Sequence, residues 1–443
     1  MNDISPILNK DPKRFIAWFS VLLSLAIALV ILNSINVPDN SNSLALVSEY
    51  NNGPFEGELD VIKSDDFDNE KNIRYDYYVR DKQGKGIAID VKGISKEKLE
   101  NLRSGVKVKI NGHKNDKKEI EALDIQVTDA SVSTGSVVTD PQAVINLEER
   151  KAVVMLVNFA DKNTSATLSG VTSVMYTGTS NVDRWYRTSS QGQLGFNPDT
   201  DGNGSPDVFG PFTIPSLSST SSCNYYQWAY EAESMAQAAG VDFSKYQHRV
   251  FVVPSNGGCG WSGIANLGCG TFCRAWTNTQ NAYVLTHELG HNLGMHHAST
   301  DPENDGIINS EYGDASDPMG NGRTLFSSPN DVKNGWAVPF PNKVIDVTQT
   351  GEYLLSPLSF NPETSSSSQV LRIRKGTTSD YYFISFRKAE GMDASINAIF
   401  TGGASIHRST NIKGGRTYLI RTLSSTVPTW TDSAYGITIS QVE

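Results

Sequence analysis

The sequence predicts a multidomain α+β protein in which a central α/β domain lies between two domains built mainly of strands. Short segments with period-2 alternation fill residues 55–127, strands and helices alternate over 150–254, and short strands return after about residue 341. The 443 residues allow about three domains of ~150 residues. The predicted parts are a cytoplasmic tail with a hydrophobic signal or anchor segment (1–40), an N-terminal β-domain (41–127), a linker (128–147), the central domain (148–341) and a C-terminal β-sandwich (342–443).

The composition is that of an ordinary folded protein, with 38% hydrophobic and 19% charged residues. The formal net charge is -10. Because binding to phosphate groups needs a basic face, this balance argues against nucleic acid as the main partner.

An apolar run from Phe15 to Leu32 follows Lys10, Lys13 and Arg14. As a helix it would span about 27 Å, close to the ~30 Å hydrocarbon core of a bilayer. The basic residues before the run predict a cytoplasmic N-terminus and export of everything after residue 40. Residues 33–38 fit a signal-peptidase site poorly, which favours a single-pass anchor over secretion after cleavage.

Residues 55–127 predict about five strands and one short helix at Ser95–Leu102, a pattern that resembles an OB-like barrel. Acidic residues are mixed with its lysines, so we expect a prodomain or accessory module and not a nucleic-acid binder. The Ser/Thr-rich linker 128–147 is the kind of segment in which proteolytic cleavage concentrates. A cut there would separate this domain.

The central domain begins with a near-continuous apolar run, Lys151–Phe159, which is typical of a strand buried on both faces. Helices are expected around residues 179–190 and 225–239, and a further strand at 248–254. This alternation predicts an α/β domain.

The stretch HELGHNLGMHH carries the chemistry of the chain. His287 and His291 are four residues apart, so on a helix they share one face and can bind one zinc ion. Glu288 is placed to act as a general base on a zinc-bound water, whose pKa zinc lowers from ~15.7 to about 7. Gly294 lets the backbone leave the helix and return His297 as the third ligand.

A chance occurrence is the alternative, but four of the seven histidines lie in residues 287–297 and every position of HExxHxxGxxH is filled. His296 does not have the spacing of the motif, so we expect an outer-shell or surface position for it. His113, His248 and His407 have no partner pattern and are expected on the surface or as satisfied core residues.

This stretch resembles the long zinc signature of the metzincins, in which a Met-turn follows. Met319, 22 residues after His297, is the matching methionine, and the resemblance implies that it lies beneath the metal as a floor and not as a ligand. EYGDASDPMG (311–320) and GCGWSGIA (258–265) are similar to the gametolysin group. The resemblance covers about residues 150–340 and implies a metzincin-like catalytic domain; some of that group have Gln where this chain has His287.

Four cysteines suit two disulfides outside the cell, with three possible pairings. A zinc site made of cysteines alone is disfavoured because the usual paired short spacings are missing. No cysteine precedes the first of them, so a cysteine from the N-terminal domain cannot hold the zinc; inhibition by that domain must be steric or use another side chain. The cysteines are Cys223, Cys259, Cys269 and Cys273.

A possible Ca²⁺ loop is DTDGNGSPD, whose alternating oxygen donors match the first half of an EF-hand. The twelfth position is Gly210 where an EF-hand needs Glu, and an ordinary Asx-rich turn is the alternative. The candidate ligands are Asp199, Asp201, Asn203 and Asp207.

These features predict an exported zinc-dependent endopeptidase that hydrolyses extracellular or cell-wall proteins, with a protein or peptide as its substrate partner. The glycine-rich segment 258–270 could form a rim for an extended substrate, because peptides commonly add to a sheet edge; packing held by disulfides is the alternative. The competing function is a non-enzymatic extracellular adhesion or binding protein with a residual zinc site.

Overall fold

The structure is a computed structural model that describes residues 52–81, 84–129, 147–218, 223–255, 259–410 and 414–442. The apolar run Phe15–Leu32 and most of the linker 128–147 lie outside the described residues. Within these ranges, no helix combines the length and the apolar character needed to cross a membrane.

The N-terminal β-domain is a closed ring of five strands around its own core. The strands pair in the order β1-β2-β3-β5-β4 and back to β1, with β3 and β5 parallel and the other pairs antiparallel. Alternate residues such as Leu59, Val108 and Ile125 are buried inside, as the period-2 pattern requires. The elements are β1 (Phe55–Asp65), β2 (Arg74–Arg80), β3 (Gly86–Asp90), α2 (Lys96–Glu100), β4 (Lys107–Lys114) and β5 (Ile120–Val127).

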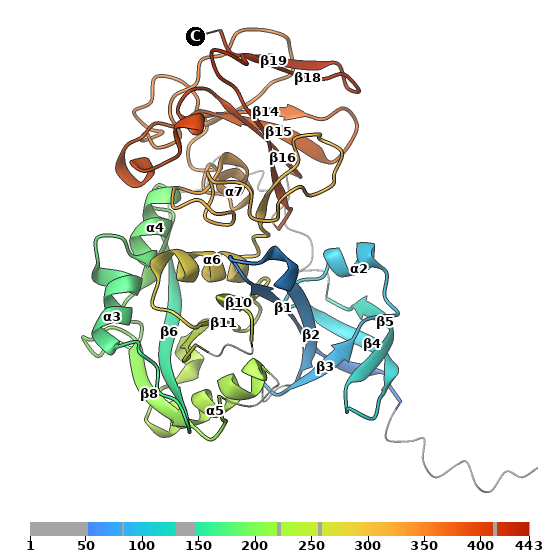
Figure 1. The fold of residues 1–443 in the computed structure, drawn as a ribbon, viewed down its shortest axis with the longest axis vertical. Coiled ribbons are helices and arrows are strands. Elements are labelled where there is room, and N and C mark those ends of the chain that lie inside the picture. The colour runs from blue at the N-terminus through green and yellow to red at the C-terminus, as the bar shows by residue number, and fades with distance from the viewer. Residues whose placement is uncertain are drawn as a thin grey trace, which may run out of the picture. The chain divides into compact units, whose positions relative to one another are not determined.

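Strand β1 belongs to two structures at once. Its eleven residues are long enough to pair with β2 and β4 in the ring and then, over Ile62–Asp65, with β10 (Gly263–Asn266) of the central domain. The β1–β10 pairing is antiparallel, and β1 lies beside the central sheet in Figure 1. The ring and the central sheet therefore form one continuous 11-stranded sheet.

The central domain is an α/β layer structure around β6 (Glu148–Phe159). Successive residues of β6 face two different cores: Val154 packs with helices α4 and α6, and Val153 packs with α5. The predicted buried strand and both predicted helices are confirmed. The other elements are α3 (Leu168–Thr172), α4 (Val182–Ser189), β7 (Leu194–Asn197), β8 (Val208–Ile214), α5 (Tyr225–Ala238), β9 (His248–Val252), β11 (Cys273–Thr277) and α6 (Ala282–Asn292).

The C-terminal part is a six-stranded sheet, in the order β12-β17-β16-β15-β14-β13, with a β18-β19 hairpin packed on its apolar residues. Strand β12 precedes the predicted boundary at residue 341, so this sheet includes a strand of the central segment. The elements are β12 (Ala298–Thr300), α7 (Ser328–Lys333), β13 (Val344–Asp346), β14 (Val370–Arg374), β15 (Asp380–Ser385), β16 (Ser405–Thr410), β17 (Thr417–Thr422), β18 (Thr429–Asp432) and β19 (Ile437–Ser440).

Candidate active site

Three buried histidines meet at one point beneath the β1–β10 pair. Helix α6 begins where the Asn281 side chain accepts from the Tyr283 amide, and Leu293 is its C-cap. Gly294, at φ +91°, then turns the chain out of the helix. The ring centroids of the three histidines lie 4.8 to 5.2 Å apart and all three side chains are fully buried; they are His287, His291 and His297.

Each histidine is fixed through its Nδ1 atom, which leaves Nε2 facing the common point. A backbone carbonyl can only accept, so Nδ1 of His287 and His291 must carry the proton. Burial lowers the pKa of His287 well below its ordinary value and that of His291 to about 4, so both rings are neutral with unprotonated Nε2. The Nδ1 contacts are His287 to the Pro318 carbonyl at 2.7 Å, His291 to the Met295 carbonyl at 2.7 Å and His297 to Glu311 Oε1 at 2.8 Å.

A fourth side chain, Asp65 at the end of β1, enters this cluster. Its Oδ2 atom lies 2.9 Å from Nε2 of His291 and 3.7 Å from Nε2 of His287, and its Oδ1 atom lies 2.7 Å from Nε2 of His297. Tyr312 donates its hydroxyl to Oδ1 at 3.0 Å.

The donor set fits a metal ion. The ligand atoms of Asp65, His287, His291 and His297 all lie within 4.8 Å of one another. Nitrogen lone pairs facing a carboxylate are acceptors without a donor, and Nε2 of His287 has no hydrogen-bond partner in the described part of the chain. A divalent cation satisfies such a cluster, and imidazole nitrogen with carboxylate oxygen is a set that zinc takes.

Glu288 lies beside the cluster, next to strand β10. It is fully buried, and neither carboxylate oxygen has a hydrogen-bond partner among the residues with described positions. The carboxylate fills the space over Gly263, where a Cβ atom would stand 2.0 Å from Oε1. Burial and the negative Asp65 raise the pKa of Glu288 well above its ordinary value, with Lys63 acting in the opposite direction.

Met319 packs beneath helix α6. Its side chain is fully buried, and its sulfur lies so close to Gly290 that a Cβ atom there would be 2.4 Å away. The preceding carbonyl, of Pro318, is the one that orients His287. The methionine therefore supports the segment of helix between the first two histidines.

The family model for gametolysin peptidase M11 matches residues 151–422. This chain belongs to the gametolysin peptidase family. The resemblance to the gametolysin group that the motifs indicated is therefore confirmed. The match extends past residues 150–340, the range over which the motifs indicated it.

Two further proteins are similar to parts of this gametolysin-family peptidase, and they add little to the family assignment. An autolysin of Chlamydomonas reinhardtii is 33% identical over 110 residues, which cover 22% of this chain and only 16% of that protein. A solved structure titled "Structure of a chaperone-substrate complex" is 12% identical and covers 58% of this chain and 36% of that chain, with a TM-score of 0.23. That score is too low to support an argument about the fold.

Sequence reasoning missed Asp65, whose partner His291 is 226 residues away along the chain. One feature of the sequence pointed in this direction. Because no cysteine precedes Cys223, any inhibition of the metal site by the N-terminal domain has to be steric or use another side chain. The surface alternative for His296 is wrong: its side chain is buried, and its Nδ1 atom lies 3.5 Å from the Tyr75 hydroxyl, outside the cluster.

The possible calcium loop of the peptidase is a well hydrogen-bonded turn. Ligand atoms of Asp199, Asp201 and Asp207 lie within 4.8 Å of one another. Asp199 accepts from three backbone amides of the loop, and Asp207 accepts from the Thr200 amide and the Tyr246 hydroxyl. Asn203 is a donor to Asp201. These bonds are those of an Asx turn, so a Ca²⁺ site stays a prediction.

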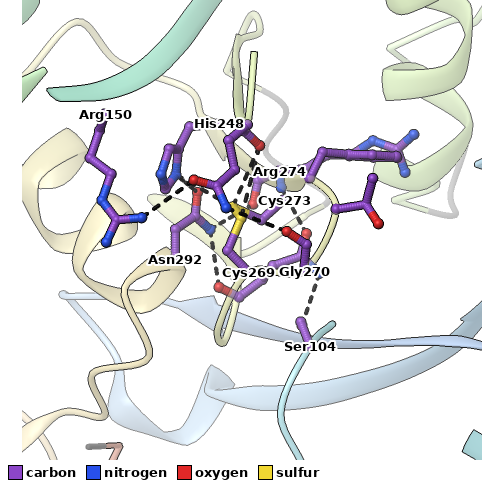
Figure 2. Close-up of a disulfide and its surroundings, with 12 residues drawn as sticks. Ser104, Arg150, His248, Cys269, Gly270, Cys273, Arg274 and Asn292 are labelled. Carbon is purple, nitrogen blue, oxygen red and sulfur yellow. Dashed lines mark hydrogen bonds between the residues drawn. A yellow bond between two sulfur atoms is a disulfide. The ribbon is translucent and has the colours of Figure 1, made fainter. Parts of the chain in front are cut away.

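The four cysteines of the peptidase form two disulfides, as predicted, and the structure pairs them as Cys223–Cys259 and Cys269–Cys273. Figure 2 shows the second disulfide beside His248 and Asn292. Asn292, the last residue of α6, donates to the carbonyls of Asn266 and Arg274. This disulfide therefore lies where the end of helix α6 is bonded to strands β10 and β11.

Proposed function

We propose that this peptidase is an exported, zinc-dependent endopeptidase of the metzincin type. The observation that supports it most is the set of three histidines whose Nε2 atoms face one point, next to a buried carboxylate without a hydrogen-bond partner in the described structure. His287, His291 and His297 would hold the zinc. When bound, zinc polarises the peptide carbonyl and makes water a nucleophile near neutral pH.

Glu288 has the position of the general base. Its raised proton affinity suits it to accept a proton from the attacking water and to deliver that proton to the leaving amine. Tyr312 carries a hydroxyl donor at the edge of the cluster, with its ring centroid 4.3 Å from that of His297. A donor there would bond to the carbonyl oxygen as negative charge develops on it.

Strand β10 is the edge of the central sheet once β1 of the N-terminal ring is left aside, and we expect the substrate to lie on it. An extended peptide that pairs with β10 would pass directly over Glu288, because Gly263 of this strand contacts the Glu288 carboxylate. Backbone pairing is independent of sequence and does not need a chain end, which suits an endopeptidase. The edge belongs to the glycine-rich segment 258–270.

The remaining architecture and location follow as proposals. The two disulfides favour an exported protein, and the similarity to a protein named autolysin favours extracellular or cell-wall proteins as substrates. We propose a metzincin-like catalytic domain, an OB-like N-terminal barrel and a C-terminal β-sandwich. Membrane attachment through residues 15–32 stays a prediction.

The test is casein hydrolysis by the full chain, before and after limited proteolysis of the linker 128–147, with elemental analysis of bound metal. We expect about one zinc per chain and hydrolysis that a chelator abolishes and added zinc restores. Glu288→Gln should keep the zinc and lose activity by about 10²-fold or more, whereas the exposed Glu303→Gln should match the wild type. If zinc is bound but no casein is hydrolysed, even after proteolysis, the competing function is favoured: a non-enzymatic extracellular adhesion or binding protein with a residual zinc site.

A further inference from the structure

The substrate edge of the peptidase is occupied by the chain itself. Residues Ile62 to Asp65 pair with β10 in antiparallel register, with Asp65 opposite Gly263. The Ser262 amide donates to the Asp65 carbonyl at 2.7 Å, and the Leu267 amide donates to the Val61 carbonyl at 2.8 Å. A peptide that needs these backbone groups cannot bind while β1 holds them.

The segment that follows Asp65 fills the neighbouring space. The Phe67 ring packs edge-on to His287 at 4.9 Å and against Tyr312 at 5.2 Å between centroids. The Glu70 carboxylate accepts from the Ser310 hydroxyl at 2.7 Å and from the Glu311 amide at 3.1 Å. Residues 62–70 therefore contact both β10 and the segment that precedes Met319 of the Met-turn.

Strand β1 cannot leave this position alone, because it closes the N-terminal ring through β2 and β4. The ring makes its own polar contacts with the central domain: Asp60 accepts from the Tyr226 hydroxyl and from Asn266. The Arg80 guanidinium also stacks on the Phe272 ring at 3.7 Å. Release of the edge therefore requires displacement of the whole domain.

We propose that Asp65 is a fourth ligand of the catalytic metal in the intact chain and that the N-terminal barrel keeps the peptidase latent by holding β1 on the substrate edge. This inference rests on the proposed function. A tethered segment competes at an effective concentration on the order of mM, so dilute substrate does not displace it. Asp65 takes the position that a cysteine from the N-terminal domain, which this chain lacks before Cys223, would need to occupy.

The decisive experiment replaces zinc by Co²⁺ in the full chain and records the visible absorption spectrum, which reports the ligands directly. Asp65→Asn should change the spectrum and weaken zinc binding by about 10- to 100-fold, measured by competition with a chelating dye. Asp68→Asn is the matched control, since it lies three residues after Asp65 in the same segment and is exposed. Its spectrum should equal that of the wild type.

A second measurement tests the access of a small ligand to the metal. Acetohydroxamate, a small metal-binding probe, should leave the cobalt spectrum of the intact wild type unchanged at concentrations that alter the spectrum of Asp65→Asn. Casein hydrolysis by intact Asp65→Asn should exceed that of intact wild type severalfold, because the N-terminal domain loses its bond to the metal and is displaced more easily. Asp68→Asn should stay near the wild type. Thermal unfolding of each variant shows that it is folded.

The outcomes separate the two proposals. If the wild type binds no Co²⁺, or if His291→Ala does not reduce the binding, the proposed metallopeptidase fails. If Co²⁺ depends on His291 but Asp65→Asn has the wild-type spectrum, only Asp65 ligation is wrong. The role of Asp65 in latency would be overturned by a changed spectrum with hydrolysis still at the wild-type level. An equal rise of hydrolysis in Asp68→Asn would overturn it as well.

Discussion

The Glu311 carboxylate lies 2.8 Å from Nδ1 of His297 and connects the histidine cluster to the C-terminal sheet. Arg416, directly before β17, donates to the same Oε1 atom at 2.6 Å. Burial raises the pKa of Glu311, but His297, Lys63 and Arg416 outweigh it, so that pKa is lowered far below its ordinary value. Glu311 is therefore an anion that fixes the tautomer and orientation of the third histidine.

Glu311→Ala should weaken zinc binding by about 10- to 100-fold, because the His297 ring loses the partner that orients it. A chelating dye in competition with the protein measures this affinity. Exposed Glu303→Ala is the control and should bind zinc as the wild type does. Equal affinities for the two variants would show that His297 does not need Glu311.

Gly263→Ala should abolish peptidase activity without loss of metal. The new Cβ atom would lie 2.0 Å from Glu288 Oε1 and 2.4 Å from its Cδ, so the carboxylate must move away from the cluster. We expect a fall in casein hydrolysis by about 10²-fold or more, measured after removal of the N-terminal domain, with zinc content unchanged. In Gly402→Ala the nearest atom would be 3.6 Å away, so that variant should keep its activity.

The metal ligands on α6 could be predicted from sequence because their geometry is local. Two histidines one helical turn apart share a face, and Gly294 permits the backbone turn that brings back His297. The same reasoning predicted helices α4 and α5, whose apolar faces are encoded within a few turns. Each of these features depends on residues close together in the chain.

Asp65 could not be predicted because its contacts are made by tertiary structure alone. The pattern around it indicates a strand, but period-2 alternation says nothing about which strand is the partner. That β1 continues from the barrel onto β10 depends on its length and on the docking of two domains. The pairing of the cysteines was open for the same reason, since it is set by which loops meet.

The two disulfides should differ in what they contribute to stability. They close loops of very different length, with sequence separations of 36 for Cys223–Cys259 and 4 for Cys269–Cys273. In the chain-entropy model, their removal costs about 4 and about 2 kcal/mol, respectively. Urea unfolding of the two double Cys→Ser variants should therefore give the lower midpoint for the first pair, and the reverse order would contradict the loop-length argument.

His248 should make the protein sensitive to acid. Its ring is fully buried between β9 and the end of α6, with Nδ1 3.2 Å from Asn292 Oδ1. Figure 2 shows these two side chains beside each other. Burial and the positive charge of Arg150 lower the pKa of His248 from 6.5 to about 3, although the contact with Asn292 opposes this. Between these two values the unfolded chain binds a proton that the folded chain does not, so stability falls as the pH decreases.

The variant His248→Gln has no titratable group at this position, so it should lack this part of the loss of stability at low pH. Between pH 7 and pH 4.5 the wild type should lose about 3 kcal/mol more of its free energy of unfolding than the variant, because one pKa unit corresponds to about 1.36 kcal/mol. Urea unfolding at both pH values measures the difference, and groups common to the two proteins cancel. The half-exposed His113→Gln should follow the wild type, whereas equal acid sensitivity of His248→Gln and the wild type would mean that folded His248 accepts a proton without cost.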